Sequence, residues 1–186
     1  MLIGENVRLR PIRKSDAGYF VEWYNDFDVI QYVGMYLPAT EIEWAKLIEE
    51  FSIERAGRET LFVIETIDGY SFKPIGTVGL HNINSVDRNA MFGIDIGEKD
   101  CWSKGYGTET GRLIIRYGFE QLGLHRIRSE VFSFNDRSIR LHNRLGFTRE
   151  GCRREAVYVN CKYHDEIYFG LLRKEWLEMK NLKTGY

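Results

Sequence analysis

The sequence predicts an α+β fold in which one layer of strands is flanked by helices. Segments with alternating apolar residues recur along the chain, and segments with apolar residues three and four positions apart lie between them. The two kinds follow each other in the order β-α-α-β-β-β-α-β-α-β-β, with a final helix. Because 186 residues contain no internal repeat, low-complexity segment or linker, residues 1–186 are expected to form a single domain.

Composition limits the class of protein. The chain is 44% hydrophobic and 28% charged, which is typical of a globular protein, and its formal charge of −1 gives no reason to expect a nucleic-acid partner. The three cysteines include no C-x-x-C pair, so we expect free thiols in a reducing compartment and no metal site. The N-terminus has no signal-like apolar region, and no run of ~20 apolar residues would span a membrane. A cytoplasmic location without membrane attachment is therefore expected.

The first expected strand and helix lie near the N-terminus. Residues 7–12 alternate and end beside a proline, which favours an edge strand. Ser15 or Asp16 is expected to cap a helix that stops at Asn25. Residues 27–39 are expected to form a loop.

A second helix is expected from Thr40, where Thr40 and Glu43 have the spacing of a capping box, to Gly57. Its acidic residues are most simply explained as a solvated face, with a cation-binding role as the minority alternative. They are Glu41, Glu43, Glu49, Glu50 and Glu54.

Three strands are expected to follow. Residues 60–67 are rich in β-branched and aromatic side chains, Asp68-Gly69 is typical of a hairpin turn, and residues 74–80 form the returning strand. After a polar turn, residues 88–96 alternate as a third strand.

The stretch that follows this strand is the most informative part of the chain. Residues 97–107 are polar and Gly-rich, and an amphipathic helix begins near Tyr106. The backbone N–H groups of residues 104–108 would point outward at the positive end of the helix dipole, which suits a phosphate or diphosphate. The glycine spacing matches neither the dinucleotide fingerprint nor the nucleotide P-loop, and an ordinary turn between strand and helix is the alternative.

The second half of the chain continues the alternation of strands and helices. A strand is expected over residues 125–132, and Asn135 is expected to cap a short helix that ends at Gly146. Two strands (147–159 and 163–172) and a terminal helix from Arg173 complete the chain.

Two motifs resemble those of the GCN5-related N-acetyltransferase (GNAT) family. Residues 102–109, Trp-Ser-Lys-Gly-Tyr-Gly-Thr-Glu, resemble the diphosphate loop of the RimJ/RimL-type branch, with Trp102 where the wider family usually has Arg or Gln. Residues 135–147 resemble the closing motif, Asn-x-x-Ser followed by Leu-Gly-Phe. The resemblance covers most of the chain. It implies the GNAT fold, with a mixed, mostly antiparallel sheet of seven strands splayed at its centre and flanked by helices, and an acyltransferase that uses acetyl-CoA.

The resemblance also implies how coenzyme A is bound. The backbone of Ile94 and Ile96 would pair with the pantetheine arm, and Asn135 would bind that arm or a water besides capping its helix. Trp102 is expected to be a packing residue of the loop. The amides that would hold the diphosphate, with Lys104 adding a positive charge, are those of Lys104, Gly105, Tyr106, Gly107 and Thr108.

The catalytic residues are less clearly indicated. By the family's behaviour, a backbone N–H within Ile94 to Ile96 would stabilise the oxyanion. The family's usual Tyr acid is replaced by His142, so Ser138 is the preferred acid, while His142 is more simply explained as structural. Asp95 and Glu130 are candidates for the base, and a water chain needing no dedicated base is a third alternative.

The acceptor is expected to be a primary amine, either a protein N-terminal amine, as the RimJ/RimL-type resemblance suggests, or a small molecule. A polyamine such as spermidine or spermine, an amine-bearing antibiotic or amino sugar, and a non-catalytic acyl-CoA-binding module are the alternatives. A homodimer is possible, since dimers are common in the family. Candidate pocket residues are Tyr32, Tyr36, His81, Tyr158 and Tyr163. Three arginines on one side of a helix are most simply explained as a solvated basic face, with a contact between one of them and the 3′-phosphate as the alternative. They are Arg137, Arg140 and Arg144.

Overall fold

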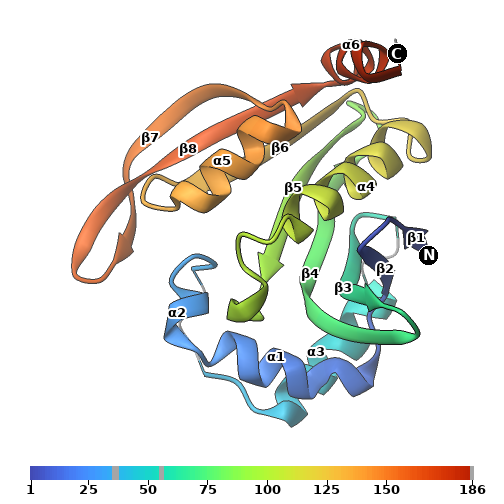
Figure 1. Cartoon of the computed structure of the whole chain (residues 1–186). Coiled ribbons are helices and arrows are strands. Elements are labelled where there is room, and N and C mark those ends of the chain that lie inside the picture. The colour runs from blue at the N-terminus through green and yellow to red at the C-terminus, as the bar shows by residue number, and fades with distance from the viewer. Residues whose placement is uncertain (35–37, 55–56, 185–186) are drawn as a thin grey trace.

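The computed structural model describes residues 1–34, 38–54 and 57–184. In this part of the chain the strands form one sheet in the order β1-β2-β3-β4-β5-β6-β8-β7 (Figure 1). The strands are β1 (Leu2–Ile3), β2 (Val7–Pro11), β3 (Thr60–Asp68), β4 (Ser71–Asn84), β5 (Asn89–Ile96), β6 (Arg126–Phe132), β7 (Thr148–Val159) and β8 (Lys162–Leu172). The helices are α1 (Ala17–Tyr24), α2 (Phe27–Ile30), α3 (Glu41–Glu54), α4 (Tyr106–Glu120), α5 (Asp136–Leu145) and α6 (Arg173–Thr184). The expected α+β order is confirmed.

Two details differ from the expectation. The sheet has eight strands instead of seven, because Leu2–Ile3 folds back as β1 and pairs with β2. The segment 27–39, expected to be a loop, begins with the single turn α2, because the side chain of Asp26 accepts the N–H of Asp28 and caps it. Both β1 and α2 are too short for their apolar residues to show a strand or helix period in the sequence.

The central feature of the sheet is the divergence of β5 and β6. These are its one parallel pair among the described strands, and they pair only from Asn89–Met91 to Arg126–Arg128. Beyond these residues β5 continues along β4, whereas β6 continues with β8 and β7, so the two halves of the sheet form a V (Figure 1). A wedge-shaped space is left at the C-terminal ends of both strands.

Apolar packing fixes the helices on either side of this divergence. The buried face of α4, which includes Leu113, Ile114 and Phe119, packs in the main core with residues of β4 to β6. A second cluster joins α1 to α3 through aromatic contacts, and the Phe20 and Trp44 ring centroids lie 5.2 Å apart. No helix in the described ranges is long and apolar enough to cross a membrane.

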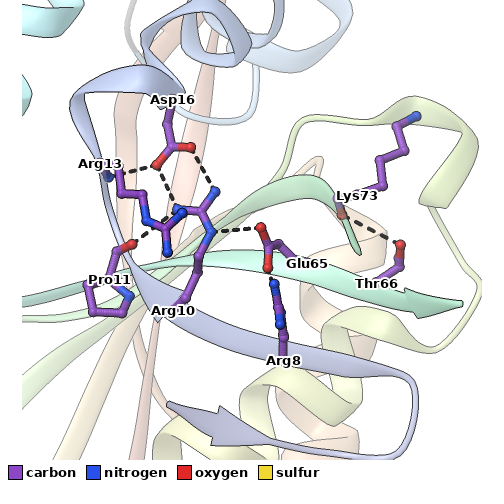
Figure 2. A network of polar contacts seen from close by, with 8 residues as sticks. All are labelled: Arg8, Arg10, Pro11, Arg13, Asp16, Glu65, Thr66 and Lys73. Atoms are coloured by element: carbon purple, nitrogen blue, oxygen red, sulfur yellow. Dashed lines mark hydrogen bonds and ion pairs between the residues drawn. The ribbon is translucent and has the colours of Figure 1, made fainter. Parts of the chain in front are cut away.

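A buried charge network attaches the start of α1 to the sheet (Figure 2). The guanidinium of Arg10 on β2 donates to both carboxylate oxygens of Asp16, at 2.8 and 2.7 Å, and to Glu65 on β3 at 2.7 Å. Arg8 donates to the second oxygen of Glu65 at 2.6 Å. Burial would raise the pKa of Glu65, but the bonds from Arg10 and Arg8 outweigh it and lower the pKa. The network therefore holds α1 in a fixed position against the sheet.

Glu109 in the first turn of α4 holds the turn between β1 and β2. Its Oε1 accepts the N–H groups of Glu5, Asn6 (2.8 Å) and Val7, and its Oε2 accepts the side-chain amide of Asn6 at 3.0 Å. Burial would raise the pKa of Glu109, but these bonds outweigh it and lower the pKa. The carboxylate thus joins the N-terminal strands to the helix that begins at the Gly-rich loop.

Replacing Glu109 with glutamine is expected to lower the free energy of unfolding at pH 7 by about 1–2 kcal/mol, because a neutral amide oxygen is a weaker acceptor for several N–H donors. A carboxyl whose folded-state pKa is depressed contributes stability above its ordinary pKa and loses it as pH falls through the lowered value. The difference between wild type and E109Q should therefore shrink in acid. Urea titrations at several pH values test this, with the exposed Glu178→Gln as control. A pH-independent difference would contradict it.

Candidate active site

A cavity of about 770 Å³ occupies the wedge between the diverging strands. Its walls come from β5, the loop that follows it, β6, α5 and the end of α2. The cavity joins the Gly-rich loop to the face of the sheet on which Asp95 lies. The residues expected to bind the cofactor and those expected to carry the chemistry are thus brought to one place.

The loop presents unpaired amides at the start of α4. Gly105 has a positive φ of 91°, a backbone conformation that suits glycine, and it is the N-cap of the helix. The N–H of Thr108 donates to the Gly105 carbonyl at 3.0 Å, so this amide is already used inside the turn. The amides of Lys104 to Gly107 have no acceptor in the described chain. They form the anion site that the sequence predicts, one amide shorter than expected.

Trp102 is a packing residue of this loop, as predicted. Its indole N–H donates to the carbonyl of Ile96 at 2.7 Å, and the Arg137 guanidinium lies 3.9 Å from its ring centroid. Tyr32 contacts the same indole edge-on, with centroids 6.4 Å apart. These three side chains bring together the end of α2, the loop and α5, which are far apart in sequence.

The same loop is attached to α1 and α2 by polar contacts. Lys99 lies 2.7 Å from the carboxylate of Asp26 and 3.0 Å from that of Asp28. The indole N–H of Trp23 donates to Glu98 at 3.0 Å. The Gly-rich loop therefore has one fixed position relative to the helices on the other side of the cavity.

The β5 backbone faces the cavity at alternate residues. The carbonyl of Phe92 accepts from Ser129 on β6, and that of Ile96 accepts from Trp102, so the even-numbered residues point away from β4. Because the N–H and C=O of one residue point to the same side of a strand, those of Ile94 also face the wedge. The carbonyl of Ile96 is already occupied, which leaves Ile94 as the more available of the two predicted backbone partners.

The Asp95 side chain lines the same cavity and is half-buried beside Tyr24 of α1. The Tyr24 hydroxyl donates to Asp95 at 3.4 Å and lies 3.3 Å from Thr77 Oγ1. Burial raises the pKa of Asp95 to about 6, against the bond from Tyr24 and the charge of His81, which lower it. A carboxyl that titrates near neutral pH can take up a proton under physiological conditions.

Three of the other ionisable side chains that line the cavity are paired. Glu130, the other candidate base, lies 2.9 Å from Arg128, and Glu166 lies 2.6 Å from Arg153. His81 lines the cavity and lies 3.3 Å from Glu59. Asp95 has no cationic side chain within ion-pair distance in the part of the chain that the structure describes.

The first turn of α5 carries the remaining predicted residues. The Asn135 side chain accepts the N–H of Ser138 at 3.1 Å, which confirms Asn135 as the helix cap. Both residues line the cavity. The Ser138 hydroxyl lies 3.4 Å from Nδ1 of His142, which is 2% exposed. Burial lowers the pKa of His142 to about 4, against its contact with the Ser138 carbonyl, so the imidazole is neutral at pH 7.

Only some of the other residues predicted to line the pocket do so in the structure. Tyr32 and His81 line the cavity, as do all three arginines of α5 that were expected to form a basic face. Tyr158 and Tyr163 form an exposed pair at the tip of the β7–β8 hairpin and do not line it. Tyr36 lies outside the described residues.

Sequence reasoning missed Tyr24, Ser129 and Glu166 as parts of the cavity region. Tyr24 and Ser129 occupy positions that fit an apolar helix stripe and a strand, and Glu166 directly follows Asp165 within a strand. No local signal distinguishes them, since each reaches the site through contacts between distant segments.

The acidic residues of α3 act as a solvated face where the structure describes their contacts. Glu49 lies 3.0 Å from Lys14 and Glu50 lies 3.7 Å from Lys46, and all four side chains are at least 50% exposed. No group of three or more His, Cys, Asp or Glu side chains suited to a metal ion is found among the described residues.

The divergence of β5 and β6 leaves room for an extended ligand, and the amides beside it suit a phosphate group. The family profile described as an acetyltransferase (GNAT) domain matches residues 6–148, and the chain belongs to this family. Acetyl-CoA is the cofactor of the family.

The chain is similar to several known N-acetyltransferases. It is 32% identical over 180 residues to an uncharacterized N-acetyltransferase p20 of Bacillus licheniformis, covering 94% of this chain and 97% of that one. It is 39% identical over 101 residues to a putative ribosomal N-acetyltransferase, YdaF, of Bacillus subtilis, covering 54% and 55%. Among solved structures, spermidine N-acetyltransferase from Vibrio cholerae in complex with CoA and spermine is similar with a TM-score of 0.84 and 25% identity, covering 92% and 98%.

Proposed function

We propose that this enzyme transfers the acetyl group of acetyl-CoA directly to a primary amine in a ternary complex. The observation that carries this proposal is the cavity itself, which joins the unpaired amides at Lys104–Gly107 to the carboxyl of Asp95, which has no ion-pair partner among the described residues. One end suits a diphosphate and the other suits a protonated amine. The wedge between β5 and β6 would hold the pantetheine arm and thioester between these ends.

In this proposal the cofactor is held mainly by backbone groups. The amides of Lys104 to Gly107 bind the diphosphate, with the exposed Lys104 side chain adding a positive charge. Ile94 pairs with the pantetheine arm as a neighbouring strand would. Ile96 contributes its N–H, because its carbonyl is bonded to Trp102, and Thr108 contributes its side chain, because its N–H is bonded inside the turn. Arg137, Arg140 and Arg144 all line the cavity, and one of them would meet the 3′-phosphate.

The chemistry then requires a base, an oxyanion donor and an acid. Asp95 takes the proton from the ammonium form of the acceptor, and the neutral nitrogen attacks the thioester carbonyl. The backbone N–H near Ile94 stabilises the oxyanion. As the C–S bond breaks, the Ser138 hydroxyl would give its proton to the departing thiolate and regain, through water, the second proton that the attacking nitrogen loses as the amide forms. Asn135 keeps the first turn of α5 in place.

The charge around the acceptor end favours a small amine that carries positive charge. Asp95 lacks a cationic partner in the described chain, whereas Glu130 and Glu166, which also line the cavity, are paired with Arg128 and Arg153. The similarity to a structure named as a spermidine N-acetyltransferase supports a polyamine acceptor, and the partial match to a putative ribosomal N-acetyltransferase supports a protein N-terminal amine. The RimJ/RimL-type relationship belongs to the second possibility.

Thiol release from acetyl-CoA tests the proposal with a panel of amines. We expect release to be faster with spermidine and spermine than with short peptides bearing a free N-terminal amine and neutral side chains. Faster release with the peptides would favour the protein acceptor instead. Binding of acetyl-CoA by calorimetry without thiol release from any amine would identify a non-catalytic acyl-CoA-binding module.

A further inference from the structure

A buried hydroxyl and imidazole lie at the point where the two central strands part. Ser129 follows Arg128, the last residue of β6 that pairs with β5, and it is 3% exposed. Its hydroxyl donates to the carbonyl of Phe92 on β5 at 3.0 Å. A side-chain hydrogen bond thus replaces the backbone bond that the next step of the ladder would have made, and it ends the pairing at a defined residue.

His142 connects this hydroxyl to α5. Its Nε2 lies 2.8 Å from Ser129 Oγ, and its Nδ1 lies 2.8 Å from the carbonyl and 3.4 Å from the hydroxyl of Ser138. Because a carbonyl oxygen only accepts, the neutral imidazole donates its Nδ1–H to Ser138, and its Nε2 accepts from the Ser129 hydroxyl, whose one hydrogen is shared between Nε2 and the Phe92 carbonyl. The imidazole therefore links the strand divergence to the first turn of α5.

Aromatic rings hold the imidazole in its orientation. The His142 ring centroid lies 5.6 Å from that of Phe92, 5.1 Å from that of Phe147 and 5.0 Å from that of Phe169. Phe92 and Phe169 belong to the two different halves of the sheet. The ring cannot turn away from Ser129 without repacking this core.

We propose that Ser129 and His142 are positioning residues that set the distance between β5 and the first turn of α5. Ile94 follows Phe92 by two residues, and Ser138 lies at the other end of the linkage. The roles of Ile94 as oxyanion donor and Ser138 as acid rest on the proposed function. The spacing itself does not, because it is a property of the strands and the helix.

Loss of this linkage should affect the chemical step more than cofactor binding. Neither residue is part of the loop at Lys104–Gly107, so the affinity for acetyl-CoA should stay within about threefold. A displacement of part of an ångström between the thioester and its donors should lower kcat by about 10- to 30-fold.

The test compares Ser129→Ala with Thr110→Val, which also removes a buried hydroxyl. Thr110 on α4 is 0% exposed, and its Oγ1 has no hydrogen-bond partner in the described chain, so T110V should keep wild-type kcat. S129A should lose kcat at nearly unchanged acetyl-CoA affinity, and Ser129→Thr, which keeps a hydroxyl, should recover most of it. His142→Phe is a second variant that removes both ring nitrogens and should lower kcat as S129A does.

Amide hydrogen exchange gives a readout that needs no activity. The N–H groups of the paired segments Asn89–Met91 and Arg126–Arg128 should exchange at least about tenfold faster in S129A than in wild type or T110V, because the end of their pairing is no longer held by Ser129. Equal exchange and equal kcat in S129A and T110V would overturn the proposal. If wild type acetylates no amine, the proposed function fails, and the exchange rates alone still decide the positioning role.

Discussion

Replacing Gly107 with aspartate is expected to weaken acetyl-CoA binding by at least about 100-fold, or about 2.7 kcal/mol. A Cβ at this position would lie 3.8 Å from Leu141 and 3.9 Å from Ile94, which are ordinary contacts, so the fold can accept the side chain. The new carboxylate would lie at the positive end of α4, where it would bind the unpaired amides and repel the diphosphate. Isothermal titration calorimetry with acetyl-CoA measures the loss.

Two further variants separate charge from the loss of glycine. Gly107→Ala adds a Cβ without charge and should change the affinity only a few-fold. Gly18→Asp adds the same carboxylate to α1 at a position where a Cβ meets nothing within 4 Å, and it should leave the affinity unchanged. Wild-type affinity in a folded G107D protein would show that the diphosphate binds elsewhere.

Replacing Asp95 with asparagine is expected to lower kcat by about 100- to 1,000-fold, because a positioned general base contributes on that order. In wild type, kcat/KM for the amine should rise with pH through about 6, the raised pKa of Asp95, because only the ionised carboxylate accepts a proton. This step in the pH profile should be absent in D95N. Steady-state kinetics over a pH series with saturating acetyl-CoA measures both effects.

The same substitution should increase stability. The pKa of Asp95 is raised in the folded state, so the folded protein binds this proton more tightly than the unfolded chain, and stability falls as pH rises from the ordinary carboxyl pKa to about 6. D95N avoids this loss and should gain about 2–3 kcal/mol at pH 7. Asp68→Asn, at an exposed strand end, is the matched control and should change neither quantity. A D95N enzyme that is less stable and fully active would contradict the role of Asp95.

The elements of the fold follow from local patterns, whereas much of the site does not. The Gly-rich loop, the cap at Asn135 and the stop at Gly146 each depend on a few neighbouring residues, and the structure confirms them as structural features. Their proposed roles toward the cofactor stay predictions. The short elements β1 and α2 lack the length over which a period can be recognised.

Properties that depend on contacts between residues far apart in the sequence cannot be predicted from local sequence patterns. The environment of Asp95 comes from Tyr24, 71 positions earlier, and the contact between Ser129 and Phe92 spans 37 positions. The sequence suggests Asp95 as one of several carboxylates, but only the packing of α1 over β5 distinguishes it from Glu130. Burial and pairing decide which acid has a shifted pKa, and both arise from the assembled fold.

The attachment of the Gly-rich loop to α1 and α2 has a consequence for engineering. Exchanging residues 17–40 for those of a relative, in order to change the amine that is accepted, would also remove Trp23, Asp26 and Asp28 from their contacts with Glu98 and Lys99. Chimeras that retain these three side chains should take on the amine preference of the relative and keep their affinity for coenzyme A. Chimeras that lack them should show weaker coenzyme A binding and should not gain the new amine preference.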